Sequence, residues 1–158
     1  MGYALQSLLR IRAMREDRAA GEMTAARQVV AAAQETLAAR RRDLAQYEAT
    51  REERRDRIFE TVIGRAVTLD QLDLAKEGVA RIDEEGILKA DNVRQAEAKL
   101  HESEAAETVA REKFNLATKN RMKIDEHKAV WLDEERKEEE ARAEGELEDF
   151  IVRKTDDD

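Results

Sequence analysis

The sequence has no cysteine and no proline, and only six of its 158 residues are aromatic. Without cysteine, the chain can form no disulfide bond, no thiolate nucleophile and no cysteine-based metal site. Without proline, its helices need neither a kink nor an early end. So few rings beside so many alanines supply too little apolar volume for the core of an ordinary globular domain of this length. A thick, enclosed core is therefore not expected.

Charge and helix-forming residues are abundant instead. Charged residues make up 42% of the chain, and alanine, glutamate, arginine, lysine and leucine dominate it. This composition is typical of a coiled coil or a long helix, although disorder is the competing interpretation of so charged a sequence. Apolar residues recur at alternating steps of three and four over residues 3–131, and this spacing favours helix.

One convincing break interrupts the helical pattern near the middle of the chain. Gly64 suits a helix C-terminus, and the segment from Thr68 to Gln71 has the form of a capping box, which starts a helix. So short a connection makes the two helices antiparallel. The sequence predicts an all-α fold, a single long antiparallel two-helix coiled-coil hairpin with helices at about residues 3–63 and 69–150. Its tip is expected at residues 62–70, and the second helix is expected to overhang the first.

Each predicted helix carries a seam of mostly apolar residues at heptad spacing. The first seam runs through Leu5, Leu9, Arg12, Ala19, Met23, Ala26, Val30, Ala33, Leu37, Arg40, Leu44, Tyr47, Arg51, Arg54 and Ile58. The second runs through Leu72, Ala75, Val79, Ile82, Gly86, Lys89, Val93, Ala96, Leu100, Ser103, Glu107, Ala110, Phe114, Ala117, Arg121, Ile124, Lys128 and Trp131. Polar residues interrupt both seams, so the predicted coiled coil is imperfect.

Folding at the tip predicts that facing residues have numbers that sum to about 133. In most of these layers a large residue then faces a small one, as complementary packing requires. Examples are Ala19 with Phe114, Leu37 with Ala96, Tyr47 with Gly86 and Ile58 with Ala75. The layers of Arg12 with Arg121 and of Ala26 with Glu107 do not fit this rule.

The net charge of −8 is concentrated at the C-terminal end. Residues 132–158 contain 13 acidic and five basic residues, whereas residues 1–131 contain 24 of each sign. We therefore divide the chain into a hairpin at 1–131 and an acidic helical extension with a frayed tail at 132–158. The balanced hairpin has no basic stripe for nucleic acid. The chain shows neither a signal peptide nor an apolar run long enough for membrane insertion, which predicts a cytoplasmic protein.

The sequence offers little for catalysis, and we expect no enzyme. His101 and His127 lie 26 residues apart on one predicted helix, too far to share a metal ion, and neither has nearby ligands at metal-binding spacing. They are expected to be solvated surface residues. Six scattered glycines form no phosphate-binding loop. No metal, cofactor or catalytic residue is predicted.

Three surface features stand out from this helical background. Tyr3 and Trp131 meet at the open end of the predicted hairpin, either as a plug or as a binding site for a partner. The start of the first helix is rich in arginine and has apolar residues away from the seam, among them Leu8. At the tip, Ile63, Val67 and Leu69 are apolar residues in a turn that can bury little of them, so they form either a local cap or a docking knob.

The same segments carry a family resemblance. The opening pattern contains Tyr3, Leu5, Leu8, Leu9, Ile11, Arg12, Arg15, Glu16, Arg18 and Ala19. The closing pattern contains His127, Lys128, Trp131, Glu134 and Glu135, followed by a glutamate-rich segment that runs to Phe150. Together with the hairpin between them, they resemble the YscO family of type III secretion proteins, the injectisome counterpart of flagellar FliJ. The resemblance covers nearly the whole chain.

This resemblance implies a function as well as a fold. It implies a hairpin similar to the stalk of the rotary ATPase γ subunit, placed at the inner-membrane base of a secretion apparatus. The implied partners are the hexameric secretion ATPase, the cytoplasmic ring of the export gate and export chaperones. The resemblance places the ATPase contact at the open end, and the gate or chaperone contact at the tip. The residues assigned to the ATPase are Tyr3, Leu5, Leu8, Leu9, Arg12, Arg15 and Trp131, and those assigned to the tip are Ile63, Arg65, Val67 and Leu69.

A protein of a different class fits the same pattern. A coiled-coil scaffold or adaptor would self-associate through its exposed seam, whereas a stalk that enters an ATPase pore is expected to be a monomer when isolated. The stalk is our leading hypothesis.

Overall fold

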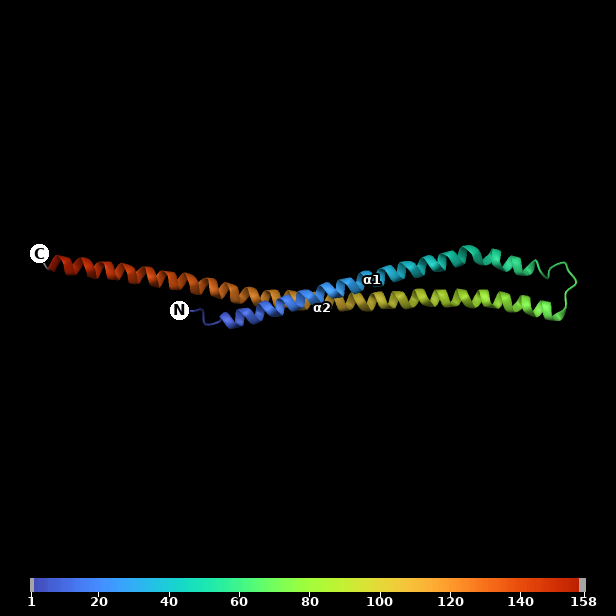
Figure 1. The fold of residues 1–158 in the computed structure, drawn as a ribbon, viewed down its shortest axis with the longest axis horizontal. Helices are drawn as coiled ribbons and strands as arrows, with labels where there is room; N and C mark the ends of the chain where they lie inside the picture. Colours follow the sequence, from blue (N-terminus) through green and yellow to red (C-terminus); the bar gives the residue numbers. More distant parts are fainter. Residues whose placement is uncertain (1, 157–158) are drawn as a thin grey trace. The chain divides into compact units, whose positions relative to one another are not determined.

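Two long helices make up the fold in the computed structural model, which describes residues 2–156 and their side chains as far as Ile151. Helix α1 spans Gln6–Phe59 and α2 spans Leu69–Asp156, joined by one turn (Figure 1). The prediction of an all-α antiparallel hairpin is confirmed. Helix α1 is shorter than predicted by three residues at its start and four at its end, and α2 runs six residues past the predicted end at 150. The last residues of the predicted frayed tail, 157 and 158, lie outside the described residues.

The turn is built by the residues that predicted it. Past Phe59 the chain tightens, because the amides of Thr61 and Val62 bond to carbonyls three residues back instead of four. Gly64 then takes a φ of 70°, which glycine adopts without steric cost. At the start of α2, the Thr68 amide donates to Gln71 Oε1 at 2.9 Å and the Gln71 amide donates to Thr68 Oγ1 at 3.2 Å. This reciprocal pair is the predicted capping box.

The hairpin divides into two compact units. The tip unit comprises residues 24–109, and the end unit comprises residues up to Met23 together with those from Ala110 onward. In the tip unit the most buried residues, each at most 9% exposed, are Ala33, Leu37, Tyr47, Ala75, Ile82, Ala96 and Ser103. In the end unit they are Tyr3 and Ala19. Among the described side chains, every buried one except that of Tyr3 lies on a predicted seam.

Large side chains of α1 fit against glycines of α2 in the tip unit. A methyl group placed on Gly86 would lie 2.5 Å from the Tyr47 hydroxyl oxygen and 2.7 Å from two of its ring carbons. A methyl group on Gly78 would lie 3.0 Å from Ile58 Cδ1. The two glycines therefore weaken the helix locally but admit the large residues that face them.

Charged partners compensate one residue in each of the two layers that broke the size rule, Arg121 and Glu107. In the end unit Arg121 pairs with Glu16 and, at 2.7 Å, with Asp125, so its positive charge is compensated although Arg12 belongs to the same predicted layer. In the tip unit Glu107 lies 3.6 Å from Arg27, the residue next to Ala26. In both layers the oppositely charged residue, Glu16 or Arg27, lies next to the seam of α1, within reach of the side chain on α2.

Beyond the start of α1, helix α2 continues without a helical partner. Residues 132–151 are exposed except Asp133 and Glu135, which are half-buried. Ion pairs within the helix link Asp133 to Arg136 and Lys137, and Arg142 to Glu138. Over the described residues, neither helix contains a segment apolar and long enough to cross a membrane.

The Tyr47 contact predicts opposite effects for the same substitution at two glycines. Gly86→Ala should destabilise the protein by about 1–3 kcal/mol, because the added methyl group overlaps the Tyr47 ring. Gly21→Ala should stabilise it by about 0.5–1 kcal/mol, since nothing lies within 4 Å of that position in the helix interior. Urea unfolding followed by circular dichroism measures both. Equal stability of the two variants would contradict the proposed packing.

Candidate partner-binding surfaces

Three aromatic rings gather in the end unit. Tyr3 precedes α1, and its ring centroid lies 5.3 Å from that of Trp131 and 5.9 Å from that of His127, two residues of α2. The Tyr3 hydroxyl lies 2.8 Å from His127 Nδ1, at hydrogen-bonding distance. Tyr3 is only 8% exposed, whereas Trp131 is half-buried. The cluster therefore ties the start of the chain to α2 and leaves part of the indole accessible.

The other residues predicted for the open end lie just before or within the first turns of α1, in the same end unit. Leu5, Leu8, Leu9 and Arg12 are half-buried and Arg15 is exposed. The outer face of α1 adds two exposed apolar residues that were not assigned to the site, Ile11 at 46% and Met14 at 65%.

His127 is the residue whose contact the sequence did not reveal. We expected a solvated histidine, and its side chain is indeed exposed, but one ring nitrogen is engaged by Tyr3. Its position one helical turn before Trp131 was the available signal, because residues four apart share a helix face. Among the described residues, no three His, Cys, Asp or Glu side chains come together as metal ligands.

The tip of the hairpin exposes the apolar residues that were predicted there. Ile63 is 69% exposed and Leu69 is 74% exposed, while Arg65 is exposed and Val67 half-buried. Leu74, which was not predicted, adds a further large side chain at 67% exposure. Beside them, open grooves run along the hairpin. One is lined by Arg57, Ile58, Thr61, Val62, Gln71, Leu74, Ala75 and Gly78.

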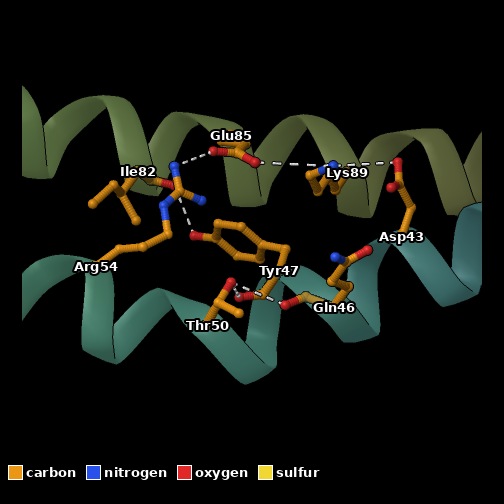
Figure 2. Close-up of polar contacts among 8 residues, drawn as sticks. All are labelled: Asp43, Gln46, Tyr47, Thr50, Arg54, Ile82, Glu85 and Lys89. Carbon is orange, nitrogen blue, oxygen red and sulfur yellow. Dashed lines mark hydrogen bonds and ion pairs between the residues drawn. The ribbon is translucent and has the colours of Figure 1, made fainter.

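A polar cluster crosses the tip unit beside Tyr47 (Figure 2). The Tyr47 hydroxyl donates a 2.7 Å hydrogen bond to the Ile82 carbonyl. Next to it, Arg54 donates to Glu85 at 2.7 Å, and Lys89 bridges Glu85 at 3.9 Å and Asp43 at 3.2 Å. Figure 2 shows these side chains reaching across between the two helices. The cluster fixes how the two helices align.

The charge pairs of this cluster shift the pKa of one carboxylate. The hydrogen bond from Arg54 lowers the pKa of Glu85 below its ordinary value, and the positive charges of Arg54 and Lys89 act in the same direction. A second lowered pKa belongs to Asp133, mainly because of its hydrogen bond with Lys137. Both carboxylates therefore keep their negative charge to a lower pH than unpaired carboxylates would.

Comparison with the sequence profiles of protein families identifies one family. The sequence profile of the family described as Type III secretion protein YscO matches residues 5–153. No curated protein matches the sequence. Among solved structures, the chain is similar to CT670 from Chlamydia trachomatis, a protein proposed to be a YscO homolog. The two superpose with a TM-score of 0.73 at 20% identity, over 95% of this chain and 92% of that one. At this identity the structural likeness speaks for the fold alone.

The depressed pKa of Glu85 predicts how its contribution to stability depends on pH. A carboxylate whose folded pKa is lowered stabilises the fold above its ordinary pKa of 4.5, and this contribution is lost as the pH falls through the folded value. Glu85→Gln should therefore lower the melting temperature at pH 7, whereas parent and variant should converge once the pH has fallen below the lowered pKa of Glu85. Thermal unfolding followed by circular dichroism over this range tests it. The exposed neighbour Glu84 serves as control, since Glu84→Gln should leave the melting temperature near that of the parent at every pH. If the difference in melting temperature between Glu85→Gln and the parent persists in acid, the stabilisation does not come from the ionised Glu85 carboxylate.

Proposed function

The chain belongs to the YscO family of type III secretion proteins, and from this we propose that it is the non-enzymatic central stalk of a type III secretion apparatus. The stalk binds and stimulates the hexameric secretion ATPase and links it to the cytoplasmic ring of the export gate, on the cytoplasmic side of the inner membrane. Its tip also contacts export chaperones. Family membership over residues 5–153 carries the proposal.

The packing of the hairpin supports a role other than catalysis. Among the described residues, no large side chain is completely buried, because each helix faces only one other helix. An enzyme needs a concave site in which several polar groups converge on a substrate. The exposed ion pairs that flank the seam form no such site, so binding is the activity that these surfaces support.

The end unit has the composition of a contact surface for the ATPase. Tryptophan and arginine are enriched among residues that dominate binding energies, and this unit offers the half-buried Trp131 and the exposed Arg15. Ile11 and Met14 add apolar area on the outer face of α1. Because charged and apolar patches are unevenly spread, the stalk can contact one ATPase subunit differently from the next. Such differential contact is what coupling to the nucleotide state requires.

The tip is the proposed contact for the gate ring or a chaperone. Ile63 and Leu69 are each more than two-thirds exposed. Exposing such apolar side chains to water is unfavourable, and a partner that covers them would remove this cost. Gly64 holds them in a turn of defined geometry. The tip therefore presents a small preformed apolar surface, with Arg65 beside it.

A self-associating scaffold is the second candidate function. Apolar residues outside the seam are exposed on α2, including Leu116 at 60% and Val130 at 57%. A second copy of the chain could cover them.

We expect changes in the end unit to weaken ATPase binding without unfolding the protein. Leu9→Asp combined with Trp131→Ala should reduce affinity for the cognate ATPase by about 30-fold, the loss typical of a binding hot spot of about 2 kcal/mol. Arg15→Glu should weaken binding as well and, because Arg15 is exposed, cannot act through the core. Pull-down and ATP-turnover assays measure binding and stimulation.

A change of the same kind at the tip provides the control. Ile63→Ser with Leu69→Ser should leave ATPase affinity unchanged and reduce binding to the gate ring or chaperone. All variants should keep the far-UV circular dichroism of the parent. If the unmodified protein neither binds the ATPase nor changes its turnover, the stalk proposal is wrong. If the protein binds the ATPase and the end-unit variants bind it as tightly as the parent does, the open end is not the contact.

The oligomeric state separates the stalk from the scaffold. Size-exclusion chromatography with light scattering should give the mass of one chain, 18.1 kDa, at micromolar concentration. A stable dimer would favour the scaffold, because a hairpin engaged with a second copy is too thick for a pore that admits two helices.

A further inference from the structure

One layer of the end unit shares its charges unequally. Arg121 on α2 pairs with Glu16 of α1 and, at 2.7 Å, with Asp125 of its own helix. Glu16 also accepts a 3.1 Å hydrogen bond from the Thr118 hydroxyl. Arg12, which belongs to the same predicted layer, forms no ion pair with any described side chain, and its Nε is buried without a hydrogen-bond partner. Of the two arginines in this layer, one therefore holds both carboxylates.

The position of Glu16 allows a second arrangement of these charges. A buried donor without a partner is unfavourable, so the Nε of Arg12 calls for an acceptor. Glu16 lies four residues after Arg12 in α1, and residues four apart are neighbours on one helix face. A change of side-chain rotamer would therefore bring the Glu16 carboxylate to Arg12. Arg121 would keep Asp125, its own neighbour four residues on.

We propose that Glu16 alternates between Arg121 and Arg12, and that this exchange acts as a latch between α1 and α2. When Glu16 pairs with Arg121, its bonds to Arg121 and Thr118 tie the two helices together. When Glu16 pairs with Arg12, each ion pair of the layer lies within a single helix. The polar ties across the interface are then absent at this layer, and the helices can separate there.

The two arrangements differ by few interactions. Each contains two ion pairs, and the side chains of Arg121 and Asp125 are 36% and 41% exposed. Pairs so open to solvent contribute little individually. The tied arrangement gains the Thr118 hydrogen bond, whereas the open one gives Arg12 a partner. A small difference of this kind leaves the minor state populated.

The latch rests on these five residues, and only its use depends on the proposed function. Arg12 belongs to the surface proposed for the ATPase. An acidic group of the ATPase that binds Arg12 would leave Glu16 with Arg121 and so keep the latch closed. Contact with one ATPase subunit would thereby make the end unit hold together more tightly, because a ligand shifts an equilibrium towards the state that it binds better.

A single introduced thiol reports on the opening of this layer in the full chain, which has no cysteine of its own. Ala19 lies three residues after Glu16 and is 8% exposed. In the Ala19→Cys protein the thiol should react with iodoacetamide, an uncharged reagent, mainly when the helices separate. Its labelling rate therefore measures how often the latch is open, and this protein serves as the parent for all further variants.

The latch predicts coupling between two residues that form no ion pair in the structure. Arg12→Gln should slow the labelling about threefold or more, because Glu16 then has no alternative to Arg121. In a Glu16→Gln background the same change should alter the rate less than about twofold, since no carboxylate is left to exchange. A fixed layer predicts equal effects of Arg12→Gln in the two backgrounds.

Neighbouring exposed residues provide matched controls. Arg15→Gln removes the same charge as Arg12→Gln and should change the labelling rate less than about twofold. Asp17→Asn removes the same charge as Glu16→Gln, and in its background Arg12→Gln should still slow the labelling. Far-UV circular dichroism checks that every variant remains helical. Equal effects of Arg12→Gln with and without Glu16, or a parent thiol that reacts no faster than global unfolding allows, would overturn the inference.

The labelling and the ATPase assay fail independently. If Arg12→Gln slows the labelling only where Glu16 is present but the ATPase does not bind, the latch stands and the stalk proposal falls. If the ATPase binds the parent but Arg12→Gln does not slow the labelling, the latch is refuted and the stalk proposal stands.

Discussion

A hairpin of two helices has a single interface in which to bury apolar surface, so every layer must fit without help from a third element. The Tyr47 layer shows how this constraint is met. A tyrosine would hold two helices apart, but Gly86 leaves a space for its ring, and the hydroxyl reaches the Ile82 carbonyl at 2.7 Å. The helices stay close enough for the smaller residues along the seam, such as Ala33 and Ala96, to be buried as well. Sliding one helix past the other would lose this fit.

Ion pairs between the helices add to the little stability that so thin an apolar interface can supply. Polar residues on a seam are costly only if they are buried without partners, and here the partners stand on the flanks of the facing helix. Glu16 neutralises Arg121, Arg27 lies near Glu107, and Glu85 accepts from Arg54. Because these pairs remain partly open to solvent, each contributes little alone. Together they allow the seam to contain polar residues as well as small ones such as alanine.

The sequence predicts those parts of the molecule that depend on nearby residues. The turn follows from Gly64 and from the reciprocal bonds of Thr68 and Gln71, and the buried seam follows from heptad spacing. The end of α1 at Phe59 was predicted four residues too late, because beyond it the chain tightens into hydrogen bonds to carbonyls three residues back. The contact of Tyr3 with His127 escaped prediction because Tyr3 lies outside α1, where helical spacing no longer fixes what a side chain meets. Binding surfaces depend on the shape of another molecule, and no periodicity within this chain encodes that shape.

The acidic part of α2 also bears on how fast a partner is captured. Residues 132–151 contain ten acidic and three basic residues, and almost all of them are exposed. A field of this sign accelerates the diffusional encounter with a positively charged surface, and dissolved ions screen it over about 10 Å at 0.1 M ionic strength. Contacts at the indole ring of Trp131 act only at short range, and they therefore mainly affect the rate at which a bound partner dissociates. Raising the salt concentration would therefore slow the arrival of a basic partner far more than it would hasten its departure.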